Sequence, residues 1–187
     1  SNGYYSSIQS ALAYNAASDL EIIIYPTVTY GLNNLAESYS PTVQNIIVRS
    51  VNSSVVSILC DWTSTSSGFQ FLNKTSVTLS YLKMVNCSTN FYANPLNFDS
   101  IQSVMIQNCV FENFRDIGGK EGPVTFKNVS LGNITGSVIQ SCYSDLNGGG
   151  LYIVNSAVGV VGSTFISNSA QNKGGGVFVT ANGGKTV

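Results

Sequence analysis

The chain has 187 residues and no histidine. This absence excludes Ser-His-Asp and Cys-His catalysis and the usual histidine metal sites. Charge is also scarce, because Asp, Glu, Lys and Arg make up only 9% of the sequence, against about 25% in an average soluble domain. The net charge is −1, so no basic field attracts nucleic acid or anionic lipid. We expect neither a nucleic-acid partner nor a cofactor.

Long hydrophobic runs are missing as well. The longest, "EIIIYP" and "QNIIVRSV", are far shorter than a membrane-spanning helix, so we expect no membrane insertion. No signal-peptide pattern is visible, as expected of a mature or trimmed chain. Ser, Thr and Asn supply most of the polarity, which suits strands and turns better than long solvated helices.

What the sequence does contain is a repeat. Five short motifs share one shape, a Gly or Pro followed by apolar, any residue, apolar: "GFQF", "PLNF", "PVTF", "GLYI" and "GVFV". Their first apolar residues, 27, 28, 27 and 26 residues apart, are Phe69, Leu96, Val124, Leu151 and Val177. Alternation of period two indicates a strand with one buried face. A strand that recurs about every 27 residues predicts one coil of a solenoid.

Other strands follow the same step. The segment Val77–Leu79 returns 27 residues later as Val104–Ile106. The next match, Val138–Ile139, comes late, so we place the extra residues in a bulged turn around "NVSLGNITGS". Three short strands per coil, separated by Gly, Asn and Ser turns, predict an all-β parallel β-helix. A β-sandwich also has many short strands, but it has no reason to repeat one at fixed intervals.

We expect a single domain over residues 1–187. Residues 1–20 have apolar side chains near helical spacing, which predicts an N-terminal capping helix, and residues 21–187 form the coils. A solenoid needs its terminal apolar faces covered. The C-terminal "GVFVTANGGKTV" begins a coil and has no such cap. We therefore expect that the natural chain continues or that another molecule covers this end.

Two motifs near the C-terminus resemble a known family. The sequence "FISN" (165–168) followed by "GGGV" (174–177) resembles the paired FxxN and GGA[ILV] repeats of the polymorphic membrane protein family, and "NGGGLY" (147–152) is a second glycine motif. The N-terminal segment is similar to the opening of right-handed β-helix proteins, including pectin-degrading enzymes. These resemblances imply a right-handed β-helix on a secreted or cell-surface protein. Within the first family they imply an adhesin or passenger domain.

The repeat motif has a structural interpretation. We expect Phe165 to fill the coil interior and Asn168 to occupy a turn, where its amide bonds neighbouring backbone. The glycines permit positive φ where the chain enters the next strand; those of the two motifs are Gly149, Gly150, Gly175 and Gly176. A phosphate cradle would need a following helix or a suitably placed lysine. Here a strand follows, and Lys173 precedes the glycines.

Catalytic groups are poorly represented. Glycoside hydrolysis needs two carboxylates about 5–10 Å apart, yet no two of the nine acidic residues are one 27-residue step apart. We interpret Glu112 and Asp116 as a turn beside Arg115, and neither arginine has acidic residues clustered around it. We expect no enzyme activity. The aromatic residues could still form a sugar-binding face, although we expect core and cap packing to account for most of them.

The four cysteines predict two disulfides. Cys60 and Cys87 are one 27-residue step apart. Cys109 and Cys142 each follow the apolar end of a strand by three residues, counted from Ile106 and Ile139, so we expect them at equivalent places on adjacent coils. Neighbouring strands are about 4.8 Å apart, within the range that a disulfide tolerates. The alternative is a ladder of reduced, buried thiols.

Five N-x-[ST] sequons occur, although a chain so rich in Asn, Ser and Thr produces several by chance. They begin at Asn52, Asn73, Asn86, Asn128 and Asn133. We expect glycans at Asn128 and Asn133 in particular, because both lie in the predicted bulged turn.

Together these observations predict a secreted, glycosylated structural protein. It would be an adhesin-like surface module or a subunit of an extracellular fibre that assembles end to end. Its expected partners are further copies of itself, other surface or matrix proteins, and glycans. The alternative is a carbohydrate-binding or carbohydrate-cleaving β-helix.

Overall fold

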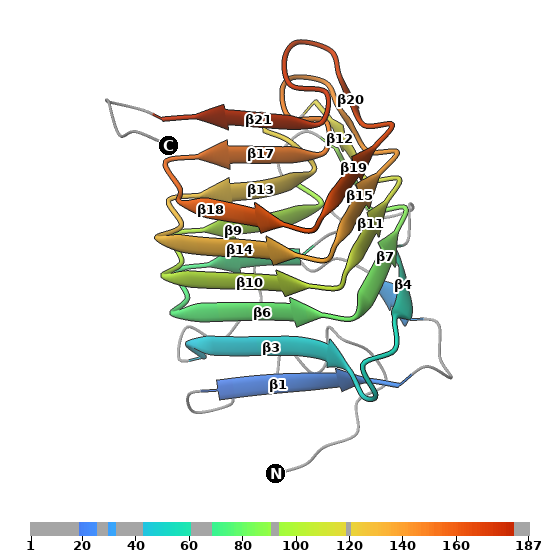
Figure 1. Ribbon diagram of the computed structural model, residues 1–187, viewed down its shortest axis with the longest axis vertical. Coiled ribbons are helices and arrows are strands. Elements are labelled where there is room, and N and C mark those ends of the chain that lie inside the picture. Colours follow the sequence, from blue (N-terminus) through green and yellow to red (C-terminus); the bar gives the residue numbers. More distant parts are fainter. Residues whose placement is uncertain are drawn as a thin grey trace.

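The protein is a parallel β-solenoid in the computed structural model, which describes residues 19–25, 30–32, 43–60, 69–90, 94–118 and 121–181 (Figure 1). Its strands stack into four parallel sheets, named A to D. Sheet A has the order β1(Asp19–Ile24), β3(Asn45–Ser50), β6(Ser76–Ser80), β10(Ser103–Gln107), β14(Leu131–Thr135), β18(Val158–Val161). Sheet B has the order β2(Tyr30–Leu32), β4(Val56–Cys60), β7(Leu82–Val85), β11(Val110–Glu112), β15(Val138–Gln140), β19(Thr164–Ile166).

Two further sheets close each coil. Sheet C has the order β8(Ser88–Asn90), β12(Arg115–Ile117), β16(Tyr143–Ser144), β20(Ser169–Ala170). Sheet D has the order β5(Phe69–Leu72), β9(Leu96–Asp99), β13(Val124–Lys127), β17(Leu151–Val154), β21(Val177–Thr180). From β6 onward the chain therefore makes four strands per coil. The prediction of three was wrong, because the strands of sheet C have only two or three, mostly polar, residues and show no alternation.

The predicted 27-residue step is confirmed. Paired residues lie 26 to 28 positions apart in sheet D and in the later strands of the other sheets. The five residues predicted to share one column are paired in series along sheet D: Phe69, Leu96, Val124, Leu151 and Val177. The first four are fully buried, whereas Val177 in the last coil is 39% exposed.

The interior is built from the apolar residues that alternate along each strand. In β10, for example, every second side chain is buried. Phenylalanines of sheet D stack along the axis, with ring centroids 5.4 Å apart between Phe71 and Phe98 and 4.9 Å apart between Phe98 and Phe126. This register places like side chains over like, so each coil extends the apolar column of the one before it.

The predicted bulged turn does not exist. Ile106 pairs with Ile134 of β14, not with Ile139, and Phe111 pairs with Ile139. The error came from Gly132, which stands where the alternation requires an apolar residue. A Cβ at Gly132 would lie 3.0 Å from the ring of Phe126. The ring of Phe126 fills this space instead, so a regular strand is hidden in the sequence.

The structure describes the last coil of the solenoid but little of the predicted N-terminal cap. Most of the predicted cap, residues 1–20, lies outside the described residues, and Asp19 and Leu20 already belong to β1. No helix occurs among the described residues. In the last coil, apolar side chains in line with the core are partly uncovered, with Val160 39% and Val179 40% exposed.

Candidate functional site

The coil corners are built on residues in the left-handed backbone conformation. Three columns of such residues, with φ between 50° and 60°, run parallel to the axis: Asn73, Ser100, Asn128, Asn155; Tyr81, Asn108, Gly136, Gly162; Asn86, Asn113, Ser141, Ser167. Asparagine tolerates this conformation better than most residues. Corner amides bond to the adjacent coil, as where Asn128 N donates to Val154 O at 3.1 Å. Six of the asparagines of the chain therefore have a structural role at these corners.

The FxxN motif acts as expected. Phe165 packs against the core and pairs with Ile139 of the preceding coil. Asn168 lies at the following corner and makes two bonds to that coil. Its Nδ2 donates to Ile139 O at 2.8 Å, and its Oδ1 accepts from Cys142 N at 3.0 Å. The side chain therefore satisfies two backbone groups of the neighbouring coil.

The glycines of the repeat motifs have a different role from the one expected. The positive φ occurs at Gly148 and Gly174, the first glycine of each run. A Cβ at Gly149 would approach Ser169 O within 2.1 Å, and one at Gly150 would approach Gly176 O within 2.6 Å. Gly149 and Gly150 are thus required by the close approach of the next coil.

Only one of the two predicted disulfides is present. Cys60 and Cys87 are bonded, with Cα atoms 4.9 Å apart, whereas Cys109 and Cys142 are buried free thiols. The pairing of these two was wrong because they occupy different corners. Cys109 immediately precedes β11 in sheet B, and Cys142 immediately precedes β16 in sheet C. Burial raises the pKa of the Cys109 thiol to about 11 and that of Cys142 to about 12, so both are protonated and unreactive at neutral pH.

The five sequons lie in unlike surroundings. Asn52 lies in an exposed turn between β3 and β4, and Asn73 and Asn128 are exposed at corners. Asn86 is half-buried, and its sequon contains the disulfide-bonded Cys87 and the buried Ser88. Asn133 lies in β14, a regular strand, and not in a bulged turn.

A polar cluster on the outer face of sheet D contains the groups closest to an active-site arrangement. This Lys127 cluster consists of Asn94, Asp99, Glu121 and Lys127. Lys127 Nζ lies 3.7 Å from Asp99 Oδ2 and 3.4 Å from Glu121 Oε1. Asn94 Nδ2 donates to Glu121 Oε2 at 3.0 Å. Spacing between acidic residues does not predict this cluster, because its register partners one coil apart are an acid and a base, Asp99 and Lys127.

The electrostatics of the Lys127 cluster disfavour base catalysis. The negative charge of Glu121 is the main cause that raises the pKa of Lys127, and Asp99 adds to it against a smaller opposing effect of burial. A lysine that removes a proton at neutral pH needs a lowered pKa. Burial, and secondarily the charge of Glu121, also raise the pKa of Tyr152 on the adjacent strand. Lys127 is therefore a fixed cation that holds two carboxylates.

The aromatic residues form a stack along this face. Tyr152 and Phe178 occupy register-paired positions on β17 and β21, with ring centroids 5.5 Å apart and planes 20° from parallel. Each ring thus covers a face of the other, which stabilises the sheet as a cross-strand pair. The stacking covers the ring faces that Tyr152 and Phe178 turn toward each other.

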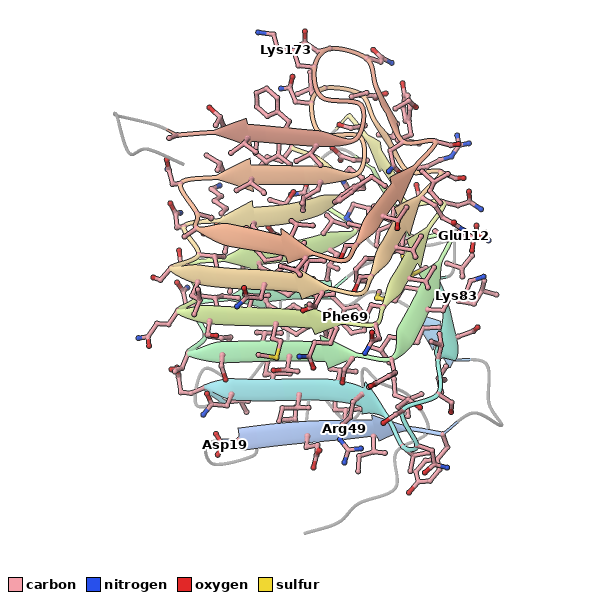
Figure 2. The ribbon with its side chains drawn as sticks, viewed as in Figure 1. Asp19, Arg49, Phe69, Lys83, Glu112 and Lys173 are labelled. Carbon is pink, nitrogen blue, oxygen red and sulfur yellow. A yellow bond between two sulfur atoms is a disulfide. The ribbon has the colours of Figure 1, made fainter. Side chains whose placement is uncertain are left out.

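Glu112 and Asp116, which were predicted to lie in one turn, belong to two different strands. Glu112 lies in β11 and pairs with Lys83 of the preceding coil, with Lys83 Nζ 2.8 Å from Glu112 Oε2 (Figure 2). Asp116 lies in β12 and is fully buried. Burial is the main cause that raises the pKa of Asp116 to about 7, with contributions from the charges of Asp145 and Glu121. The described residues contain no group of three or more His, Cys, Asp or Glu side chains arranged to hold a metal ion.

Comparison of the chain with family models, curated proteins and solved structures finds no match. The resemblance to the polymorphic membrane protein family therefore rests on the FxxN and glycine motifs alone. Among the described residues, no helix is long and apolar enough to cross a membrane.

Proposed function

We propose that the chain is a non-catalytic structural module of a secreted or cell-surface protein, either adhesin-like or part of an extracellular fibre that grows by end-to-end stacking. The observation that carries this proposal is the regular stack of parallel coils, in which like residues pair in series from one coil to the next. Val160 and Val177 are each 39% exposed, yet their register partners Ile134 and Leu151 are buried. Burying these side chains against another coil would be favourable by the hydrophobic effect.

The finer features of the proposal have separate support. A right-handed coil is favoured because parallel crossover connections are right-handed in nearly all proteins. The Cys60–Cys87 disulfide agrees with an oxidising, extracellular environment. The exposed turn at Asn52 and the exposed corners at Asn73 and Asn128 make these three sequons the best candidates for N-glycans.

Light scattering after gel filtration, together with negative-stain microscopy, tests the assembly. We expect the molar mass to rise with protein concentration and rods to appear. A Val160→Lys variant should stay monomeric, because it places a charge in line with the core. The matched control is Val161→Lys, since Val161 is the next residue of β18, faces outward and is 64% exposed. Monodisperse wild-type protein at every concentration, or equal behaviour of the two variants, would contradict the proposal.

Carbohydrate binding is the second candidate, and the position of the Lys127 cluster beside Tyr152 favours it. Carboxylate, amide and ammonium groups with a neighbouring aromatic ring are typical of sugar sites. A glycan array probed with wild-type protein and with Tyr152→Ala tests this candidate. Loss of a glycan signal in the variant would support it, and absence of any signal from the wild type would reject it.

A further inference from the structure

One of the five sequons is built into the disulfide. Only the sequon Asn86-Cys87-Ser88 contains a cysteine, and Cys87 is bonded to Cys60, 27 residues earlier in the chain. Cys60 is the last residue of β4, which pairs in parallel with β7, the strand that ends directly before the sequon. The disulfide therefore fixes this sequon against the end of β4.

Once folded, the sequon is closed to modification. The next coil holds its backbone on both sides, since Asn86 N donates to Glu112 O at 3.0 Å. Cys87 O accepts a bond from Arg115 N at 2.8 Å. Asn86 has a left-handed φ of 60°, and both Cys87 and Ser88 are buried. Transfer of an N-glycan needs the asparagine amide and the hydroxyl two residues later on an accessible segment. A glycan can therefore be attached to Asn86 only before this corner forms.

The disulfide can close the corner early. Cys60 enters the secretory compartment first, because it precedes Cys87 by 27 residues. Synthesis covers such a distance within seconds at about 5–20 residues per second, and disulfide formation takes seconds to hours. Both thiols are thus present while Asn86 is within reach of the transferring enzyme. Disulfide closure and glycan transfer compete for the same segment.

We propose that Asn86 is an N-glycan acceptor whose occupancy is controlled by closure of the Cys60–Cys87 disulfide, an inference that rests on the proposed secretion of the chain. In the transfer, Asn86 Nδ2 loses one proton and bonds to C1 of a sugar. The bond from C1 to the pyrophosphate of a lipid-linked oligosaccharide breaks, and the lipid pyrophosphate leaves. In the closure, the two thiols lose two electrons and two protons to a disulfide oxidant of the compartment, which becomes a dithiol.

The order of the two reactions decides the product. Transfer uses the amide nitrogen of Asn86 and leaves the Cys87 thiol intact, so a glycosylated chain can still form the disulfide. Asn86 Oδ1, which accepts a bond from Asn113 Nδ2 at 3.3 Å, is also unchanged by the transfer. A chain that forms the disulfide first keeps Asn86 bare. The protein is therefore made in two forms that share the disulfide and differ in one glycan.

Two other corner sequons are internal controls. Asn73 and Asn128 share the left-handed backbone of Asn86, with φ of 54° and 53°. Each is followed by a buried residue, Lys74 or Val129, but neither sequon contains a cysteine. Asn73 also lies within the segment that the disulfide closes, so a general delay of folding acts on Asn73 as it does on Asn86.

Site occupancy of the full chain, directed by a signal peptide into cells that attach N-glycans, tests the proposal. Peptide N-glycosidase in heavy-oxygen water converts each glycosylated asparagine to labelled aspartate, which mass spectrometry quantifies in total cell protein, so that chains that fail to fold are included. We expect Asn86 occupancy to rise about twofold in Cys60→Ser, because competing steps of similar rate leave about half of the wild-type chains bare. Dithiothreitol during synthesis should have the same effect on the wild type. Cys109→Ser, which removes a buried free thiol, should change nothing.

Several outcomes would overturn the proposal. One is equal occupancy of Asn86 in wild type and Cys60→Ser, whether the site is full or bare. Another is an equal rise at Asn73, which would show slower folding and not the release of one sequon. In both cases, glycans on Asn73 or Asn128 would leave the proposed glycosylation of the chain intact. Bare asparagines at all five sequons would contradict that proposed glycosylation, and this inference with it.

Discussion

Single polar side chains at the corners hold neighbouring coils together, and Asn168 gives the clearest case. Its amide bonds both Ile139 O and Cys142 N of the preceding coil. We expect Asn168→Ala to lower the free energy of unfolding by about 2 kcal/mol, because two buried backbone groups lose their partners. The matched control is Asn172→Ala, an exposed asparagine in the same coil, which should change stability by less than about 0.5 kcal/mol. Urea denaturation of both variants checks this, and equal effects would contradict it.

A second residue-scale prediction concerns Gly132, whose missing side chain leaves room for Phe126. A Cβ there would lie 3.0 Å from Phe126 Cε1 and 3.0 Å from Val158 Cγ2. We expect Gly132→Ala to destabilise by about 1–3 kcal/mol through overpacking. Gly159→Ala is the control, since its Cβ would meet the end of the Asn133 side chain at 3.1 Å and Gly132 O at an ordinary contact distance of 3.9 Å. Thermal unfolding of the two variants tests this prediction. A Gly132→Ala variant as stable as the wild type would contradict it.

At the scale of the element, the number of free cysteines tests the strand register. The register in the structure leaves two thiols free, whereas the register expected from sequence spacing leaves none. The disulfide joins Cys60, the last residue of β4, to Cys87, which directly precedes β8, while Cys109 and Cys142 directly precede strands of different sheets. We expect an Ellman assay on the denatured, unreduced protein to find two thiols per chain. A result of zero thiols would show that Cys109 and Cys142 are bonded after all. A result of four would show that Cys60 and Cys87 are not bonded.

Loss of the Cys60–Cys87 disulfide should lower the free energy of unfolding. A disulfide that closes 27 residues stabilises a protein by about 3.5 kcal/mol in the chain-entropy account. We expect dithiothreitol to lower the midpoint of urea unfolding in the wild type. The Cys60→Ser/Cys87→Ser double variant should match the reduced wild type and should not respond to the reductant.

The sequence predicted those elements whose inward side chains are large. The column from Phe69 to Leu151 was found because each member is apolar and flanked by Gly or Pro. Strand β14 was missed because Gly132 interrupts its alternation, and the shift of one strand carried Cys109 and Cys142 into a false pairing. The strands of sheet C were missed because two or three polar residues have no detectable period. The Lys127 cluster was missed because it pairs a lysine with an acid of the neighbouring coil, and only spacings between acids were compared.

At the scale of the whole molecule, the solenoid is a stack in which each coil contacts only its neighbours. Stability in such an array is approximately a sum of coil and interface contributions. The middle coils, such as β10–β13, are covered on both sides (Figure 1). The last described coil exposes apolar side chains that the others bury. Local opening should therefore be easiest in β18–β21.

End-to-end stacking predicts that this opening depends on concentration. If another copy binds the edge formed by β18 and β21, amides of this coil should become protected as assembly proceeds. At a free concentration ten times the dissociation constant, local opening should fall about tenfold. Hydrogen exchange measured by mass spectrometry at low and high protein concentration checks this, with amides of β10–β13 as the internal control. Val160→Lys should abolish the concentration effect and Val161→Lys should retain it, whereas exchange in β18–β21 that is independent of concentration in the wild type would rule out stacking at this edge.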